Sequence, residues 1–148
     1  MKNFISIVDM FQRIQLNFHA IQHKVEIEKF IPALLRFPDK QFIFQMDSVN
    51  NNLLNTARAA RINAVPLFDT SGGAGILPDR WPSMDGYCGY AGGLSPGNIE
   101  QQIPLIEAAT ISKPVWIDAE THLRSSDNKI LDEYKTTMYI IRSSKYLM

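Results

Sequence analysis

The chain has 148 residues, 45% of them hydrophobic and 20% charged, and its 15 lysines and arginines balance its 15 aspartates and glutamates. A chain without excess positive charge does not attract nucleic acid or an anionic membrane, so neither partner is expected. No apolar stretch approaches the ~20 residues of a membrane span. Residues 1–13 lack the apolar core of a signal peptide. The chain has a single cysteine, which excludes an internal disulfide. We therefore expect a single domain over residues 1–148, soluble and cytoplasmic.

Strand-like and helix-like patterns alternate along the chain. Short β-like runs predict strands over 13–18, 41–46, 64–69, 87–91 and 114–118. Apolar residues spaced by threes and fours predict helices over 3–12, 25–37, 48–62, 96–109 and 127–141, the fourth with Ser95 as its N-cap and Pro96 as its first residue. This alternation indicates βα units and a mostly parallel sheet. Two architectures remain open, an open doubly wound sheet and the last five-eighths of a closed (β/α) barrel.

The glycines are concentrated in one part of the chain, since all eight lie between positions 72 and 97. Glycine is favoured where φ is positive or where another group approaches the backbone closely. The run 90–99 reads as a strand end, the pair Gly92–Gly93 and a helix start, an arrangement in which backbone amides bind a phosphate. The glycine pair could instead serve tight packing of the strand against the helix, and the whole glycine-rich segment could instead be a long, turn-rich surface loop.

Charged side chains follow two of the expected strands, at the edge where parallel strands place their ligands. Asp69 ends the third strand and is a candidate general acid, or else a turn former. Asp118, Glu120, His122 and Arg124 follow the fifth strand and form either a ligand site or a salt-bridged loop. His19 and His23 are too far from other ligand types to indicate a metal, so we expect no metal and no cofactor.

Two of these runs, FDTSGGAG (68–75) and AGGLSPGNI (91–99), resemble the sixth and seventh strands of the phosphoribosylanthranilate isomerase family. The pattern of that family is an aspartate, a short loop and Gly-Gly-Thr-Gly, then Ala-Gly-Gly-Leu-x-Pro-x-Asn-Val. VWIDAETHLRSSDNKI (115–130) stands where the family has its eighth strand and phosphate loop, and IQLNFHA (14–20) where it has its fourth strand. The resemblance covers roughly residues 13–142 and is strongest over 66–99.

The resemblance implies a partial TIM barrel of about five parallel βα units, equivalent to strands four to eight of the family. It implies an Amadori rearrangement in tryptophan biosynthesis, in which an aminoaldose phosphate becomes a 1-amino-1-deoxyketose, with Asp69 as the acid that protonates the ribose ring oxygen. It further implies that a small sugar phosphate is bound by Gly72, Gly73, Gly75, Gly92, Gly93, Glu120, Thr121 and Arg124.

The sequence departs from the family pattern at three points. The family's base is a cysteine at the end of the first strand, before the part that this chain resembles, and Cys88 lies inside a later strand. The loop after Asp69 is shorter than is usual in the family, and Glu120 with Asp118 brings two carboxylates to the expected phosphate loop. The alternatives are a catalytically silent phosphate-binding module, a subunit that completes a barrel, and a different reaction with Asp118 or Glu120 as base. Open sheet edges would be covered by self-association or by a partner chain.

Overall fold

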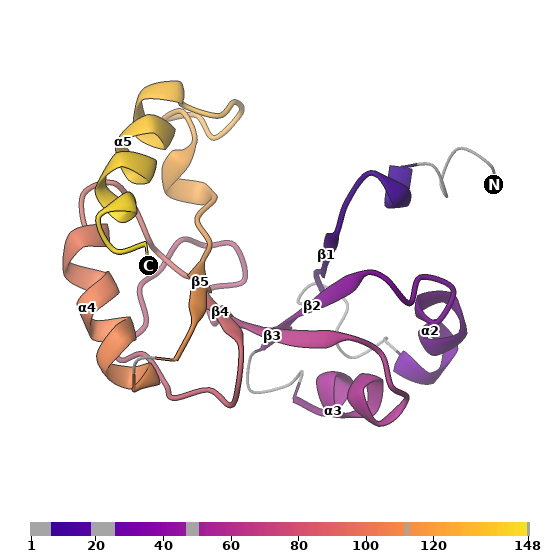
Figure 1. Cartoon of the computed structure of the whole chain (residues 1–148). Helices are drawn as coiled ribbons and strands as arrows, with labels where there is room; N and C mark the ends of the chain where they lie inside the picture. The colour runs from indigo at the N-terminus through magenta and orange to yellow at the C-terminus, as the bar shows by residue number, and fades with distance from the viewer. Residues whose placement is uncertain (1–6, 19–25, 47–50, 112, 148) are drawn as a thin grey trace. The chain divides into compact units, whose positions relative to one another are not determined.

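The computed structural model describes residues 7–18, 26–46, 51–111 and 113–147 (Figure 1). Of the helix expected over 3–12, residues 7–9 are helical and residues 1–6 lie outside the described part. His19, His23 and the start of the helix expected at 48 also lie outside it.

Five strands form one parallel sheet in an α/β fold. They are β1 (Arg13–Leu16), β2 (Gln41–Met46), β3 (Ala64–Phe68), β4 (Cys88–Tyr90) and β5 (Val115–Ile117). Their order in the sheet is the order in the chain, β1-β2-β3-β4-β5, with Arg13 opposite Gln41 and Cys88 opposite Val115. A doubly wound sheet reverses its strand order at a switch point, and this sheet has no such reversal.

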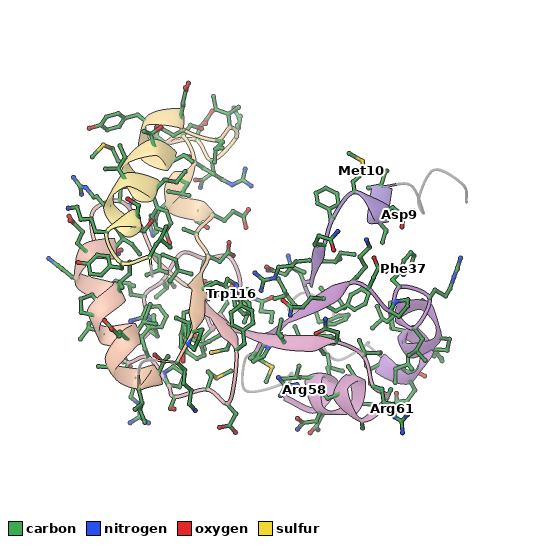
Figure 2. All side chains as sticks on the ribbon, viewed as in Figure 1. Asp9, Met10, Phe37, Arg58, Arg61 and Trp116 are labelled. Atoms are coloured by element: carbon green, nitrogen blue, oxygen red, sulfur yellow. The ribbon has the colours of Figure 1, made fainter. Side chains whose placement is uncertain are left out.

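The chain divides into two compact units, Met1–Leu67 and Phe68–Met148. The first unit contains β1, β2, most of β3 and the helices α2 (Ile27–Leu34) and α3 (Asn51–Ala59). Phe44 of β2 and Phe30 of α2 pack on the same ring, that of Phe18, with centroids 5.9 and 6.1 Å away. Arg58, labelled in Figure 2, donates from Nε to the Ala64 carbonyl at 3.0 Å and so ties the end of α3 to the start of β3.

The second unit contains β4, β5 and the helices α4 (Ile99–Thr110) and α5 (Glu133–Ser144), with the short 3₁₀ helix η2 (Thr121–Leu123) between β5 and α5. Its core combines residues of both helices, alternate residues of β4, and residues of η2 and of the loops on either side of β4, namely Trp81, Cys88, Tyr90, Leu94, Ile99, Ile106, Leu123 and Tyr139. Val115 and Ile117 of β5 pack against the same core. Since side chains alternate between the faces of a strand, α4 and α5 cover the same face of β4 and β5 (Figure 1).

The opposite face of these two strands holds Gly89 and Trp116, which are neighbours in register. A Cβ atom added at Gly89 would lie 2.2 Å from the indole ring, so the glycine makes room for Trp116. The ring of Tyr87 packs on the same indole with centroids 4.8 Å apart. Trp116 is labelled on β5 in Figure 2. The indole therefore takes the space that a larger residue at position 89 would need.

Two of the expected helix starts are wrong. α4 begins at Ile99 with Asn98 as its N-cap, and a turn over 96–98 precedes it. The Asn98 side chain accepts from the Ser95 amide and donates to the Gly93 carbonyl, both at 2.9 Å, and so holds this turn outside the helix. α5 begins at Glu133 because the Asp132 side chain accepts from the Lys135 amide at 2.9 Å, a capping bond that fixes the first turn there.

Candidate functional site

Three loops of the second unit meet beyond the carboxyl ends of β3, β4 and β5. The first begins at Asp69, the second contains Gly92 and Gly93, and the third begins at Asp118. A Cβ added at Gly92 would lie 3.6 Å from Oδ1 of Asp69 and 3.2 Å from the Ile76 carbonyl oxygen. The acid expected from the sequence and the glycine pair expected one strand away are therefore in contact.

The carboxylate of Asp69 is held by its own loop. Oδ1 accepts from the Ser71 amide at 3.0 Å and from the Ser71 hydroxyl at 2.7 Å. Asp69 is half-buried, and a short polar side chain that bonds the backbone two residues on is typical of a turn. Asp69 therefore does form a turn, and the two hydrogen bonds of this turn hold its Oδ1 beside Gly92.

The glycine loop after β3 is fastened by two side chains from the loop after β5. Thr121 donates from Oγ1 to the Gly73 carbonyl at 2.9 Å. Nε2 of His122 lies 2.7 Å from the Gly75 carbonyl, and because a carbonyl only accepts, this nitrogen carries the proton. Gly72, Gly73 and Gly75 all have positive φ. In this conformation Thr121 and His122 therefore hold the glycine loop in place through these hydrogen bonds. The sequence alone does not suggest this role.

Gly93 lies directly beneath the backbone of the same loop. Its φ is +66°, and a Cβ added here would lie 2.4 Å from the Leu77 nitrogen and 2.8 Å from the Ile76 carbonyl carbon. This glycine is therefore closely packed, but against the backbone of a loop rather than between the strand and the helix. The amides of Gly92 and Gly93 donate no hydrogen bond to another residue in the described part of the chain. Gly92 is half-buried and Gly93 is buried.

Asp118 adds a second carboxyl to the same edge. Its amide donates to the Tyr90 carbonyl at 2.9 Å, which fixes the residue directly after β5. Burial raises the pKa of its carboxyl, and the charges of Asp69 and Glu120 raise it further. Sequence reasoning offered Asp118 only as an alternative base. The signal that identifies it is its position, since it follows β5 as Asp69 follows β3.

Glu120 and Arg124 form an ion pair, with 2.7 Å between Oε1 and Nη2. The interpretation of this segment as a salt-bridged loop therefore holds for these two residues. Two-thirds of the Glu120 side chain and about one-third of that of Arg124 are exposed, so the pair contributes less than about 1 kcal/mol and is readily exchanged for another partner. Their expected role in substrate binding stays a prediction.

Cys88 lies on the helix-facing side of β4 and is fully buried. Burial is the main cause that raises the pKa of its thiol, so this residue does not supply a thiolate at the loop edge. In the described residues, no group of three or more His, Cys, Asp or Glu side chains is arranged to hold a metal ion. No described helix is long and apolar enough to span a lipid bilayer.

Replacing Asp118 by asparagine is expected to change how stability depends on pH. A carboxyl whose pKa is raised by folding stabilises the folded chain while it is protonated, and this stability is lost as the pH rises through the folded pKa. An asparagine side chain does not ionise, so the stability of D118N relative to the parent should grow as the pH rises above about 4, the ordinary aspartate pKa, by about 1.4 kcal/mol for each unit of pKa difference. Urea unfolding at several pH values measures this gain. A gain that is constant with pH, or equal to that of the exposed Asp79→Asn control, would contradict it.

No match to the chain is found among protein-family models, curated proteins or solved structures. Its function therefore has to be inferred from the residues at the carboxyl edge of the strands and from their geometry.

Proposed function

We propose that the chain is an isomerase of the phosphoribosylanthranilate isomerase type, which converts an N-linked ribose phosphate from aldose to ketose form. The observation that carries this proposal is the contact between Asp69 and Gly92. An acid and a pair of amides that donate to no other described residue, after adjacent strands, are what such a reaction requires, one to protonate the ring oxygen and the other to hold the phosphate.

We further propose that its sheet belongs to a partial TIM barrel. In such a barrel the strands follow in chain order and every helix lies on the outer face. The strand order β1-β2-β3-β4-β5 agrees with this, and so do α4 and α5, which cover the same face of β4 and β5. Trp116 on the other face then occupies the barrel interior, which is normally filled by side chains.

The proposed reaction needs only proton transfers. Asp69 gives a proton to the ring oxygen, the bond between that oxygen and C1 breaks, and the nitrogen lone pair forms a C1–N double bond. Removal of the proton from C2 then gives an enaminol, which becomes the 1-amino-1-deoxyketose when a proton returns to C1 and the C2 hydroxyl gives up its proton, so that two protons are donated and two are released. We assign removal of the C2 proton to Asp118 or Glu120, the other carboxylates that follow the strands at this edge, because the cysteine that the family uses precedes the part that this chain resembles.

The amides of Gly92 and Gly93 supply the phosphate contacts in this proposal, together with Thr121 and Arg124. The negative charge of Glu120 repels an anion. A bound phosphate would therefore replace Glu120 as the ion-pair partner of Arg124. The loop of Gly72, Gly73 and Gly75 closes this site on the β3 side.

A second candidate is a catalytically silent module that binds sugar phosphates. Two observations favour it. Ser71 occupies Oδ1 of Asp69 with two hydrogen bonds, and the backbone of residues 76–77 covers one side of Gly93. Both arrangements fit a site that binds a sugar phosphate but does not transfer a proton.

Two measurements on the whole chain test the proposal. Turnover is followed by the loss of anthranilate fluorescence from N-(5-phosphoribosyl)anthranilate, and binding by the change in tryptophan fluorescence on titration with ribose 5-phosphate, with ribose as the control. The isomerase proposal expects both turnover and phosphate-dependent binding. Binding without turnover supports the silent module, and the absence of both at millimolar ligand overturns the two proposals together.

A further inference from the structure

The glycine loop, residues 70–77, touches both groups of residues that are proposed to hold the phosphate. A Cβ added at Gly75 would lie 3.1 Å from Cβ of Thr121. The next residue of the loop lies against the glycine pair, since the Ile76 carbonyl oxygen is 3.2 Å from a Cβ added at Gly92. A phosphate that contacts Thr121 and the glycine pair at the same time therefore meets this loop.

The loop is held less firmly than η2, the 3₁₀ helix that carries Thr121. Leu123 of η2 is buried in the core of the second unit, and its carbonyl accepts from the Asp132 amide at 2.7 Å. Ile76 and Leu77 of the loop are 63% and 37% exposed and lie outside that core. Segments with few buried apolar contacts are the ones that open locally. We therefore expect the loop, rather than η2, to move when a ligand enters.

The hydroxyl of Thr121 has one proton, and it donates this proton to the Gly73 carbonyl at 2.9 Å. A phosphate ester near neutral pH is mainly a dianion, which accepts hydrogen bonds and has no proton to donate. Thr121 therefore donates either to Gly73 or to a phosphate. His122 is not among the proposed phosphate contacts, so its bond to Gly75 is not subject to this competition.

Gly73 belongs to the turn that holds the carboxylate of Asp69. The Ala74 amide donates to the Ser71 carbonyl at 3.0 Å and closes this turn. Ser71 in turn donates to Oδ1 of Asp69 from its amide and from its hydroxyl. The bond from Thr121 fixes the same turn from outside. Loss of that bond would therefore loosen the segment that occupies the proposed acid.

We propose that a bound phosphate displaces the Gly73 carbonyl as the acceptor of the Thr121 hydroxyl, and that this exchange releases the turn that occupies Asp69. The phosphate end of a substrate is in this way coupled to the acid, and a sugar without phosphate leaves Ser71 on Oδ1. This inference concerns the regulation of the proposed site and rests on the proposed function, in which Thr121 contacts the phosphate.

One NMR signal reports on the bond from Thr121 to Gly73. Gly73–Ala74 is the single Gly–Ala pair of the sequence, so a chain labelled with carbonyl-13C glycine and 15N alanine gives one carbonyl-to-amide signal. Thr121→Val removes the donor and should shift this signal in the free chain. Thr136→Val, which removes a hydroxyl from α5, should leave it in place. Equal signals in T121V and the parent would overturn the proposal.

Titration of the whole chain with ribose 5-phosphate tests the release, with ribose as the control. The signal of the parent should move toward its position in T121V, with the midpoint of the tryptophan fluorescence change, and ribose should not move it. Thr121→Ser keeps a hydroxyl and should respond as the parent does, whereas T121V should not respond.

The outcome also separates this proposal from the proposed function. Phosphate-dependent fluorescence change with an unmoved Gly73 signal would overturn the release and leave the isomerase proposal standing. Absence of any fluorescence change at millimolar ligand would overturn both. The titration of the parent needs no variant, so the release stays falsifiable even if T121V does not fold.

Discussion

Replacing Asp69 by asparagine is expected to lower turnover of the aminoaldose phosphate by about 10²- to 10⁴-fold, the usual contribution of a general acid. The amide does not donate a proton to the ring oxygen as a carboxylic acid does. The asparagine side chain keeps an oxygen that accepts from the Ser71 amide and hydroxyl, so the loop beside Gly92 should stay in place. Steady-state kinetics with N-(5-phosphoribosyl)anthranilate measure the change.

The control for this variant is Asp85→Asn, which removes the same charge from an exposed position of the same unit. D85N should turn over at the parental rate. D69N should still bind ribose 5-phosphate, because the phosphate is assigned to amides rather than to this carboxyl. Parental turnover in D69N would remove Asp69 from the proposed chemistry, and loss of both turnover and binding would assign it a structural role.

Much of the sheet is predictable from the sequence, because a strand is a local pattern. β2 occupies the predicted residues 41–46, and β3, β4 and β5 lie within the predicted ranges. Their apolar runs are bounded by glycine, proline or polar residues, which end strands wherever they occur. Asp69 and Gly92 follow from the same reasoning, since parallel strands end at one edge.

The start and the buried face of α5 are not predictable in this way. The apolar spacing of Ile130, Tyr134 and Ile141 suggests a buried face, yet these three side chains are more than half exposed. The structure buries Tyr139 instead, beneath β5 and η2. Asp132 starts the helix six residues after the predicted start at 127, and the packing of the helix on β5 decides which side faces inward. Tyr139 escapes sequence reasoning because its burial depends on this packing.

The contact between Gly93 and the loop after β3 is also not predictable from the sequence, because it joins residues that are far apart in the chain. This contact distinguishes Gly93 from the other glycines. Gly73 also has positive φ, at +87°, but a Cβ added there would meet nothing within 4 Å. A Cβ at Gly93 would collide with the backbone of Ile76 and Leu77, which cannot turn aside as a side chain can. A residue other than glycine would be strained by the positive φ at both positions, but its Cβ would collide with another group only at position 93.

Gly93→Ala is therefore expected to destabilise the chain by about 2–4 kcal/mol, the sum of the left-handed backbone strain and of overpacking. Gly73→Ala should cost only the strain, about 1–2 kcal/mol. Urea unfolding of both variants measures the difference, and hydrogen exchange should show faster exchange over residues 71–77 in G93A alone. Equal losses in the two variants would mean that the loop does not lie on Gly93 in solution. In that case the loop would not restrict the approach of a phosphate to the amides of the glycine pair.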